Sequence, residues 1–163
     1  MDEAARGALR LVCFELRGQE LALPIADVRE TLPVQPITRV VLTPPCLAGV
    51  FSLRGDIVPA IDLGVLLGLA RTELSDDSRI VVVDRDGATI GIVVDRLRDL
   101  RTLDEPLEPA PSHLAPAVAQ LLMGVAATTT GTVRVLDAHA IISAEALRQL
   151  ARSTAQIEEG TSA

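Results

Sequence analysis

Short runs of alternating apolar and polar residues, interrupted by glycine-containing pairs, occupy most of the chain. In RLVCFELRGQELALPI, two such runs flank Arg17-Gly18, and the apolar side chains of each run fall on one face. RIVVVDRDGATIGIVVD repeats this arrangement around Asp86-Gly87, a pair suited to the positive φ angles of a tight turn. In GVFSLRGDIVPAIDL the turn falls at Gly55. The pattern therefore predicts a mainly β protein built from hairpins.

The hairpin pattern occurs twice along the chain. A shift of 69 residues places Gly18 on Gly87 and matches the residues that follow, and a shift of 75 aligns the later part of each copy. The extra residues of the second copy fall in the proline-rich stretch EPLEPAPSHLAP, where an insertion costs little. We infer two similar barrel-like β units in tandem, over about 9–75 and 76–142. Chance similarity between strings rich in valine, leucine and glycine is the alternative.

Short helices are expected after the later hairpin of each copy. Asp62 and Asp137 are placed to accept hydrogen bonds from the free N–H groups at the start of such a helix. Ser143 is placed to begin a closing helix with apolar residues at helical spacing. The expected division is an N-terminal tail over 1–8, one domain over 9–150, a closing helix over 143–153 and a flexible tail over 154–163.

The composition argues against several classes of function. A net charge of −7 opposes nucleic-acid binding, which depends on neutralising phosphates, and an aromatic content of 1% cannot build stacking platforms for bases. No apolar run approaches the roughly 18 residues that a membrane-spanning helix needs. Cys13 and Cys46 show neither a metal spacing nor a disulfide framework. We therefore expect a protein of the reducing cytoplasm that does not bind nucleic acid or insert into the membrane.

Catalytic residues are not apparent in the sequence. The two histidines are His113, in a proline-rich loop, and His139, at the start of a short helix, and surface or packing roles suit both. No glycine-rich phosphate loop follows a strand, and the acidic residues are scattered over turns and helix caps. We expect no catalytic residue, no cofactor and no metal site.

One long segment is much more specific. GVFSLRGDIVPAIDLGVLLGL closely resembles a segment of the CheW-like family, the coupling proteins of bacterial chemosensory arrays and the matching regulatory domain of their histidine kinase. LALPIADVRETL, PITRVVLTPPCLAGV, IVVVDRDGATIGIVVDRLRDL and LEPAP have counterparts in the same order, so the resemblance spans about Leu9 to Leu150. It implies two intertwined five-stranded SH3- or OB-like β-barrel subdomains with short helices and a C-terminal helix.

The resemblance implies a non-enzymatic signalling adaptor. Members of the family bind the regulatory domain of a chemosensory histidine kinase and the cytoplasmic tip of a chemoreceptor, which places them at membrane-associated receptor arrays. The family's partner-contacting positions fall on Val28, Glu30, Gly49, Arg54, Ile80, Leu100 and Gly124. A core position is the alternative for the three aliphatic residues, a structural salt bridge or turn anchor for the arginine, and a backbone requirement for the two glycines.

Two residues depart from the family pattern. Ser52 stands where the family usually has asparagine, and Thr31 stands where an aliphatic residue is usual. The first change removes hydrogen-bonding groups from the hairpin and the second removes apolar contact from a receptor-facing position. A kinase-only binder or a regulator of a non-flagellar motility or developmental pathway therefore remains an alternative. A ligand-sensing module and a scaffold that self-associates or forms rings are further alternatives.

Overall fold

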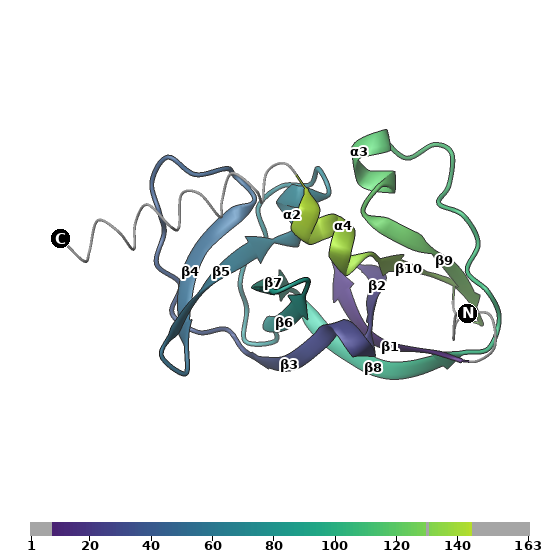
Figure 1. Ribbon diagram of the computed structural model, residues 1–163. Coiled ribbons are helices and arrows are strands. Elements are labelled where there is room, and N and C mark those ends of the chain that lie inside the picture. Colours follow the sequence, from purple (N-terminus) through teal and green to yellow (C-terminus); the bar gives the residue numbers. More distant parts are fainter. Residues whose placement is uncertain (1–7, 130, 145–163) are drawn as a thin grey trace.

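The computed structural model describes residues 8–129 and 131–144 of the 163-residue chain. The expected tail over 154–163 and all but two residues of the expected closing helix lie outside these residues. The described chain forms two five-stranded sheets with a few short helical turns (Figure 1). None of its helices is long and apolar enough to cross a membrane.

The first sheet has the strand order β8-β1-β2-β10-β9, and the second has the order β3-β6-β7-β5-β4. The strands of the first sheet are β1 (Leu9–Leu16), β2 (Gln19–Pro24), β8 (Arg96–Leu103), β9 (Leu122–Thr128) and β10 (Gly131–Leu136). Those of the second are β3 (Val28–Pro33), β4 (Leu47–Leu53), β5 (Asp56–Asp62), β6 (Arg79–Arg85) and β7 (Ala88–Val94). The connections include η1 (Ile25–Asp27), α2 (Leu63–Leu66), α3 (Pro116–Ala119) and α4 (Ala138–Ser143).

The two sheets have the same strand order under the internal repeat, in which β1 to β5 correspond to β6 to β10. Each sheet combines the first hairpin of one copy with the third strand and second hairpin of the other copy. In each, the second hairpin joins through a parallel pair, β10 with β2 and β5 with β7. The expected boundary near residue 75 therefore divides the repeat and not the sheets, because strands are exchanged between the copies.

The mainly β fold class with SH3-like sheets is confirmed, although neither sheet closes into a complete barrel. In the first sheet, β8 and β9 remain edge strands, and the chain between them reaches β9 through the bridge of Glu108 to Val125. Thr38 makes the corresponding bridge to Val50 in the second sheet. In each sheet, the connecting chain thus pairs with the edge strand, β4 or β9, at one isolated bridge.

Tight turns form where the glycine pairs predict them. Arg17 and Gly18 have φ angles of 53° and 76°, Arg54 and Gly55 have 52° and 90°, and Asp86 and Gly87 have 56° and 78°. Positive φ at both central residues matches the twist of a two-residue hairpin, and the glycine in each pair adopts it without steric cost. The three predicted hairpins are confirmed.

The core has one central cluster between the sheets and one smaller cluster inside each sheet. The central cluster includes Phe14, and the cluster of the second sheet is built around Phe51. A Cβ atom on Gly91 would lie 2.7 Å from the Phe51 ring, so the phenylalanine occupies the space that the glycine leaves. In the other sheet the equivalent positions are Ala22 and Ala126, both buried. The two halves therefore fill equivalent space with different pairs of residues.

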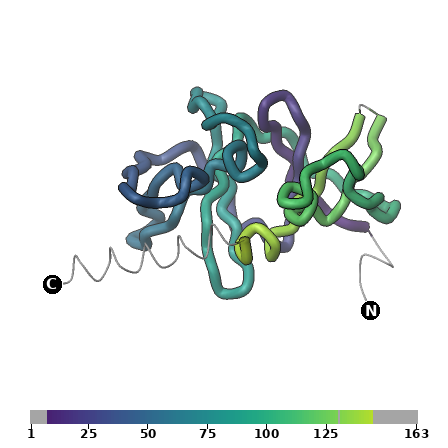
Figure 2. Tube along the Cα trace, turned by 90° about the horizontal axis from the view of Figure 1, so that it is seen from above, coloured from purple at the N-terminus to yellow at the C-terminus, as the bar shows by residue number. Residues whose placement is uncertain are grey.

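Both predicted helix caps form. Asp62 accepts a hydrogen bond from the Val65 N–H group at the start of α2, and Asp137 accepts one from Ala140 at the start of α4. Seen along the perpendicular direction, the β3–β4 and β8–β9 connections lie at opposite ends of the molecule (Figure 2). The strands β3 and β8 meet between these ends (Figure 1).

Candidate binding groove

A groove of about 320 Å³ lies where the two sheets meet, between the edge strands β3 and β8. Both strands pair on one side only, β3 with β6 and β8 with β1. Side chains from β1 complete the lining. The groove is lined by Val12, Cys13, Val28, Glu30, Thr31, Leu97, Arg98, Asp99 and Leu100.

The internal repeat explains the two walls of the groove. Val28, Glu30 and Thr31 on β3 are the repeat equivalents of Leu97, Asp99 and Leu100 on β8. The pairing register of each strand is interrupted within its set, between Val28 and Glu30 on β3 and between Leu97 and Leu100 on β8. A bulge turns the following side chains, so that both edges present residues to the shared groove.

The aliphatic residues give the groove a floor and an exposed wall. Val28 and Leu97 are half-buried and pack against the central core cluster. Leu100 is 65% exposed, so most of its aliphatic side chain is open to solvent at the groove. Burial raises the pKa of the Cys13 thiol to about 11, so that this side chain is neutral and acts as apolar lining. The groove therefore offers apolar area that remains exposed to water.

The β4–β5 hairpin adds an ion pair to the β3 wall. The Arg54 guanidinium, at the tip of this hairpin, forms two hydrogen bonds with the Glu30 carboxylate, and Nη2 to Oε1 measures 2.8 Å. The hydrogen bond from Arg54 holds the pKa of Glu30 below its usual value and raises the pKa of Arg54. Bidentate geometry fixes both side chains, so the hairpin and the groove wall are held in one arrangement.

The ion pair predicts a measurable titration. We expect the Glu30 carboxylate to titrate below the usual glutamate value in the native protein and at that value in Arg54→Ala, because the guanidinium stabilises the ionised form. The ion pair is complete at neutral pH and is lost as the pH falls through the lowered pKa of Glu30. A ¹³C NMR titration of the side-chain carboxyl gives both midpoints. Equal midpoints in the two proteins would contradict the ion pair.

The structure places four of the seven predicted partner-binding residues in or beside the groove. Val28, Glu30 and Leu100 line it, and Arg54 is hydrogen-bonded to its wall. Ile80 requires a correction, because its side chain is completely buried in the core cluster of the second sheet. A completely buried side chain cannot contact a partner while the fold is intact, so the core alternative holds for Ile80.

Gly49 and Gly124 occupy equivalent places, each where the connecting bridge crosses its sheet. A Cβ atom on Gly49 would lie 2.4 Å from the carbonyl oxygen of Thr38, and one on Gly124 would lie 2.6 Å from that of Glu108. Real Cβ atoms do not approach oxygen so closely. Both glycines are buried, so each allows the connecting chain to pass close to the strand.

Replacement of either glycine should therefore reduce stability. We expect Gly49→Ala and Gly124→Ala each to lower the free energy of unfolding by about 2–3 kcal/mol, because the added methyl group displaces the bridging backbone. Urea denaturation followed by circular dichroism measures the loss. Unchanged stability together with lost partner binding would show instead that the glycines contact the partner directly.

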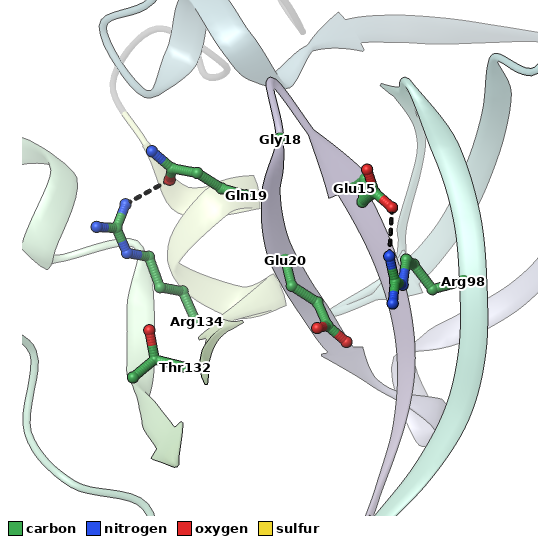
Figure 3. A pocket seen from close by; sticks show the side chains of 7 residues that line it. All are labelled: Glu15, Gly18, Gln19, Glu20, Arg98, Thr132 and Arg134. Carbon is green, nitrogen blue, oxygen red and sulfur yellow. Dashed lines mark hydrogen bonds and ion pairs between the residues drawn. The ribbon is translucent and has the colours of Figure 1, made fainter. Parts of the chain in front are cut away.

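A second hollow, of about 450 Å³, is polar. It lies beside the β1–β2 turn, and Figure 3 shows two of its contacts, one between Glu15 and Arg98 and one between Gln19 and Arg134. Arg98 binds Glu15, and Arg134 donates to the Gln19 side chain at 2.7 Å. Glu20 lies 3.2 Å from Arg101. The first two contacts link neighbouring strands of the first sheet, and the third reaches across β1 from β8 to β2. Together they account for most of the charge in the hollow.

Candidate catalytic and metal-binding groups have structural partners in the described residues. His139 is exposed on α4 and bonds to Asp86 at the β6–β7 turn, which lowers the pKa of that carboxyl group. Cys13, Glu20 and Asp99 place possible ligand atoms within 4.8 Å of one another. However, the Arg101 guanidinium lies 3.2 Å from Glu20 and 3.4 Å from Asp99, and the thiol is protonated. The two carboxylates of this set are therefore paired with Arg101, and the set is not suited to a metal ion.

On β8, three groove residues were not among the sequence-predicted partner residues: Leu97, Arg98 and Asp99. The signal for them was present, because the 69-residue shift aligns them with Val28, Arg29 and Glu30. The repeat alone does not show that these residues share a groove with β3, because that depends on the exchange of strands between the two copies.

The described residues form a small protein of two β sheets with an apolar groove between them as the candidate site. Chain comparisons agree with this class. A family model for the CheW-like domain matches residues 10–146. The crystal structure of the scaffolding protein TtCheW from Thermoanaerobacter tengcongensis superimposes with a TM-score of 0.76 and 29% identity, covering 85% of this chain and 90% of that one.

Two chemotaxis proteins CheW give similar matches. The protein from Klebsiella aerogenes is 30% identical over 133 residues, covering 81% of this chain and 80% of its own length. The protein from Bacillus subtilis is 28% identical over 137 residues, covering 83% and 88%. The chain belongs to the CheW-like family, whose members are non-enzymatic adaptors of chemotaxis signalling.

Proposed function

We propose that this protein couples chemoreceptors to a chemosensory histidine kinase in a chemotaxis-like pathway of the bacterial cytoplasm. In this proposal the groove between β3 and β8 binds the cytoplasmic tip of a receptor. The observation that carries it is the exposed aliphatic wall at Leu100 beside the fixed Glu30 to Arg54 pair. A groove with exposed apolar area and a polar rim is suited to a helical segment with one apolar face.

An adaptor needs a second surface for its other partner. Val41 and Leu42, in the β3–β4 connection, are 83% and 99% exposed. The loop is held in place, because Thr43 donates to the Val40 carbonyl oxygen and Leu47 donates to that of Pro44. Leu42 adopts a φ of 60°, which is strained for a leucine, and such strain is common at binding sites. We assign this loop to the regulatory domain of the kinase.

Binding assays with both partners test the proposal. The purified chain is titrated with the regulatory domain of the chemosensory kinase from its own organism and separately with a receptor tip hairpin. We expect saturable binding in the micromolar range, about −8 kcal/mol, to each partner. Arg54→Glu should weaken binding of the receptor tip, because it places two carboxylates side by side at the groove wall. A well-folded chain that binds neither partner would overturn the proposal.

The kinase-only alternative keeps one specific observation in its favour. Thr31 is exposed on the groove wall, where an aliphatic residue would add apolar contact. This alternative predicts kinase binding without receptor binding, which the same two titrations reveal. Self-association would instead use exposed edges such as β4 or β9. Light scattering of the chain alone, at the concentrations of the assay, separates that outcome from partner binding.

A further inference from the structure

The two walls of the groove are equivalent by repeat but differ in chemistry. On β3, the position facing the groove is Thr31, whereas the equivalent on β8 is Leu100. The β8 wall therefore supplies more apolar area. A bound segment gains the most free energy when its aliphatic side chains lie against β8.

The charges of the two walls also differ. On β3, the Glu30 carboxylate is paired with the Arg54 guanidinium. Beside β8, Asp99 and the β2 residue Glu20 share one guanidinium, that of Arg101, at 3.4 Å and 3.2 Å.

The neighbouring arginine does not correct this imbalance. Arg98 is hydrogen-bonded to Glu15 and is thus already matched. It also interacts electrostatically with Glu20 and with Asp99, whose side chain is 53% exposed, but its hydrogen bond goes to Glu15. Around the β8 wall, three carboxylates, those of Glu15, Glu20 and Asp99, thus face the two guanidiniums of Arg98 and Arg101, which leaves one carboxylate in excess near the exposed Leu100.

We infer that the groove selects an amphipathic segment whose aliphatic stripe is flanked by lysine or arginine on the side that faces β8. The inference rests on the proposed function, because it specifies the chemistry of the segment that the groove binds. The aliphatic residue covers Leu100 and a basic residue pairs with Asp99. The β3 wall, with Glu30 paired to Arg54 and a threonine at its centre, contributes little to this selection.

A matched pair of helical peptides tests the inference without a receptor. Both carry the same leucine stripe, and the flanking positions hold lysine in one peptide and glutamate in the other. Titration into ¹⁵N-labelled protein is followed through the amide shifts of β3 and β8. We expect the lysine peptide to bind roughly fivefold more tightly at low ionic strength, with the difference shrinking at high salt.

Two carboxylate variants test whether Asp99 causes the preference for the lysine peptide. Asp99→Asn should remove most of it. Asp104→Asn should leave it unchanged, because Asp104 is also exposed but lies beyond the end of β8 and outside the groove. Equal binding of the two peptides, tighter binding of the glutamate peptide, or binding of neither peptide in the groove would overturn the inference.

The outcomes separate this inference from the proposed function. A receptor tip that shifts the groove amides while the peptides bind equally would leave the coupling function standing and overturn the charge selection. A lysine peptide that binds as expected while the receptor tip and the kinase domain both fail to bind would support the groove chemistry. It would also overturn the coupling function.

Discussion

Replacement of Asp62 with alanine is expected to lower the free energy of unfolding by about 3–5 kcal/mol. The carboxylate is buried and accepts hydrogen bonds from the Thr72 N–H and hydroxyl groups, both at 2.8 Å, in addition to capping α2. Alanine leaves these donors buried without an acceptor. Arg17 also donates to Thr72, so the loss extends to the contact between the β1–β2 turn and this loop.

Asp137 provides the matched control for this prediction. It is the repeat equivalent of Asp62 and caps α4 through a hydrogen bond of 3.0 Å from Ala140, but it has no partner equivalent to Thr72 among the described residues. We expect Asp137→Ala to cost about 1 kcal/mol, the usual value of a cap. Urea denaturation of the two variants gives the comparison. Equal losses would show that the buried network around Asp62 adds nothing to its cap.

Replacement of Leu100 with aspartate is expected to weaken receptor-tip binding by about 100-fold while leaving the fold intact. The side chain is already largely exposed, so the substitution changes the stability of the free protein little. In the complex, the substitution removes an aliphatic contact and adds a second carboxylate beside Asp99, which must then be buried against the partner. Isothermal titration with a receptor tip hairpin measures the change.

Leu42→Asp is the matched control for the groove variant. The substitution is chemically identical, and Leu42 is 99% exposed on the β3–β4 connection, outside the groove. We expect it to leave receptor-tip binding unchanged and to weaken binding of the kinase regulatory domain. Loss of receptor binding in both variants would mean that the groove is not the particular site of the receptor tip.

The sequence was informative about the local structure. Hairpins, their turns and the caps at Asp62 and Asp137 depend on residues close in the chain, and all of them form as predicted. The exchange of strands between the copies could not be predicted in this way. The pairing of β2 with β10 joins residues more than 100 positions apart, and hydrophobic alternation carries no information about which copy supplies a neighbouring strand.

The site shows the same division. Val28, Glu30, Arg54 and Leu100 lie at the groove, as their place in the family pattern suggested, and their role in binding stays a prediction. Ile80, a partner-contacting position in the family pattern, takes the core alternative here, because β6 is buried along most of its length. In a strand covered on both faces, apolar residues run on without alternation, and the sequence cannot distinguish a contact residue from a core residue.

The central claim is that one molecule holds a receptor and a kinase through two separate surfaces. Sedimentation velocity of the chain with a labelled receptor tip hairpin and the kinase regulatory domain tests it directly. We expect one complex that contains all three components, from which Leu100→Asp loses the receptor tip and Leu42→Asp loses the kinase domain. Two binary complexes that exclude each other, with the receptor tip and the kinase domain competing for the chain, would contradict the account.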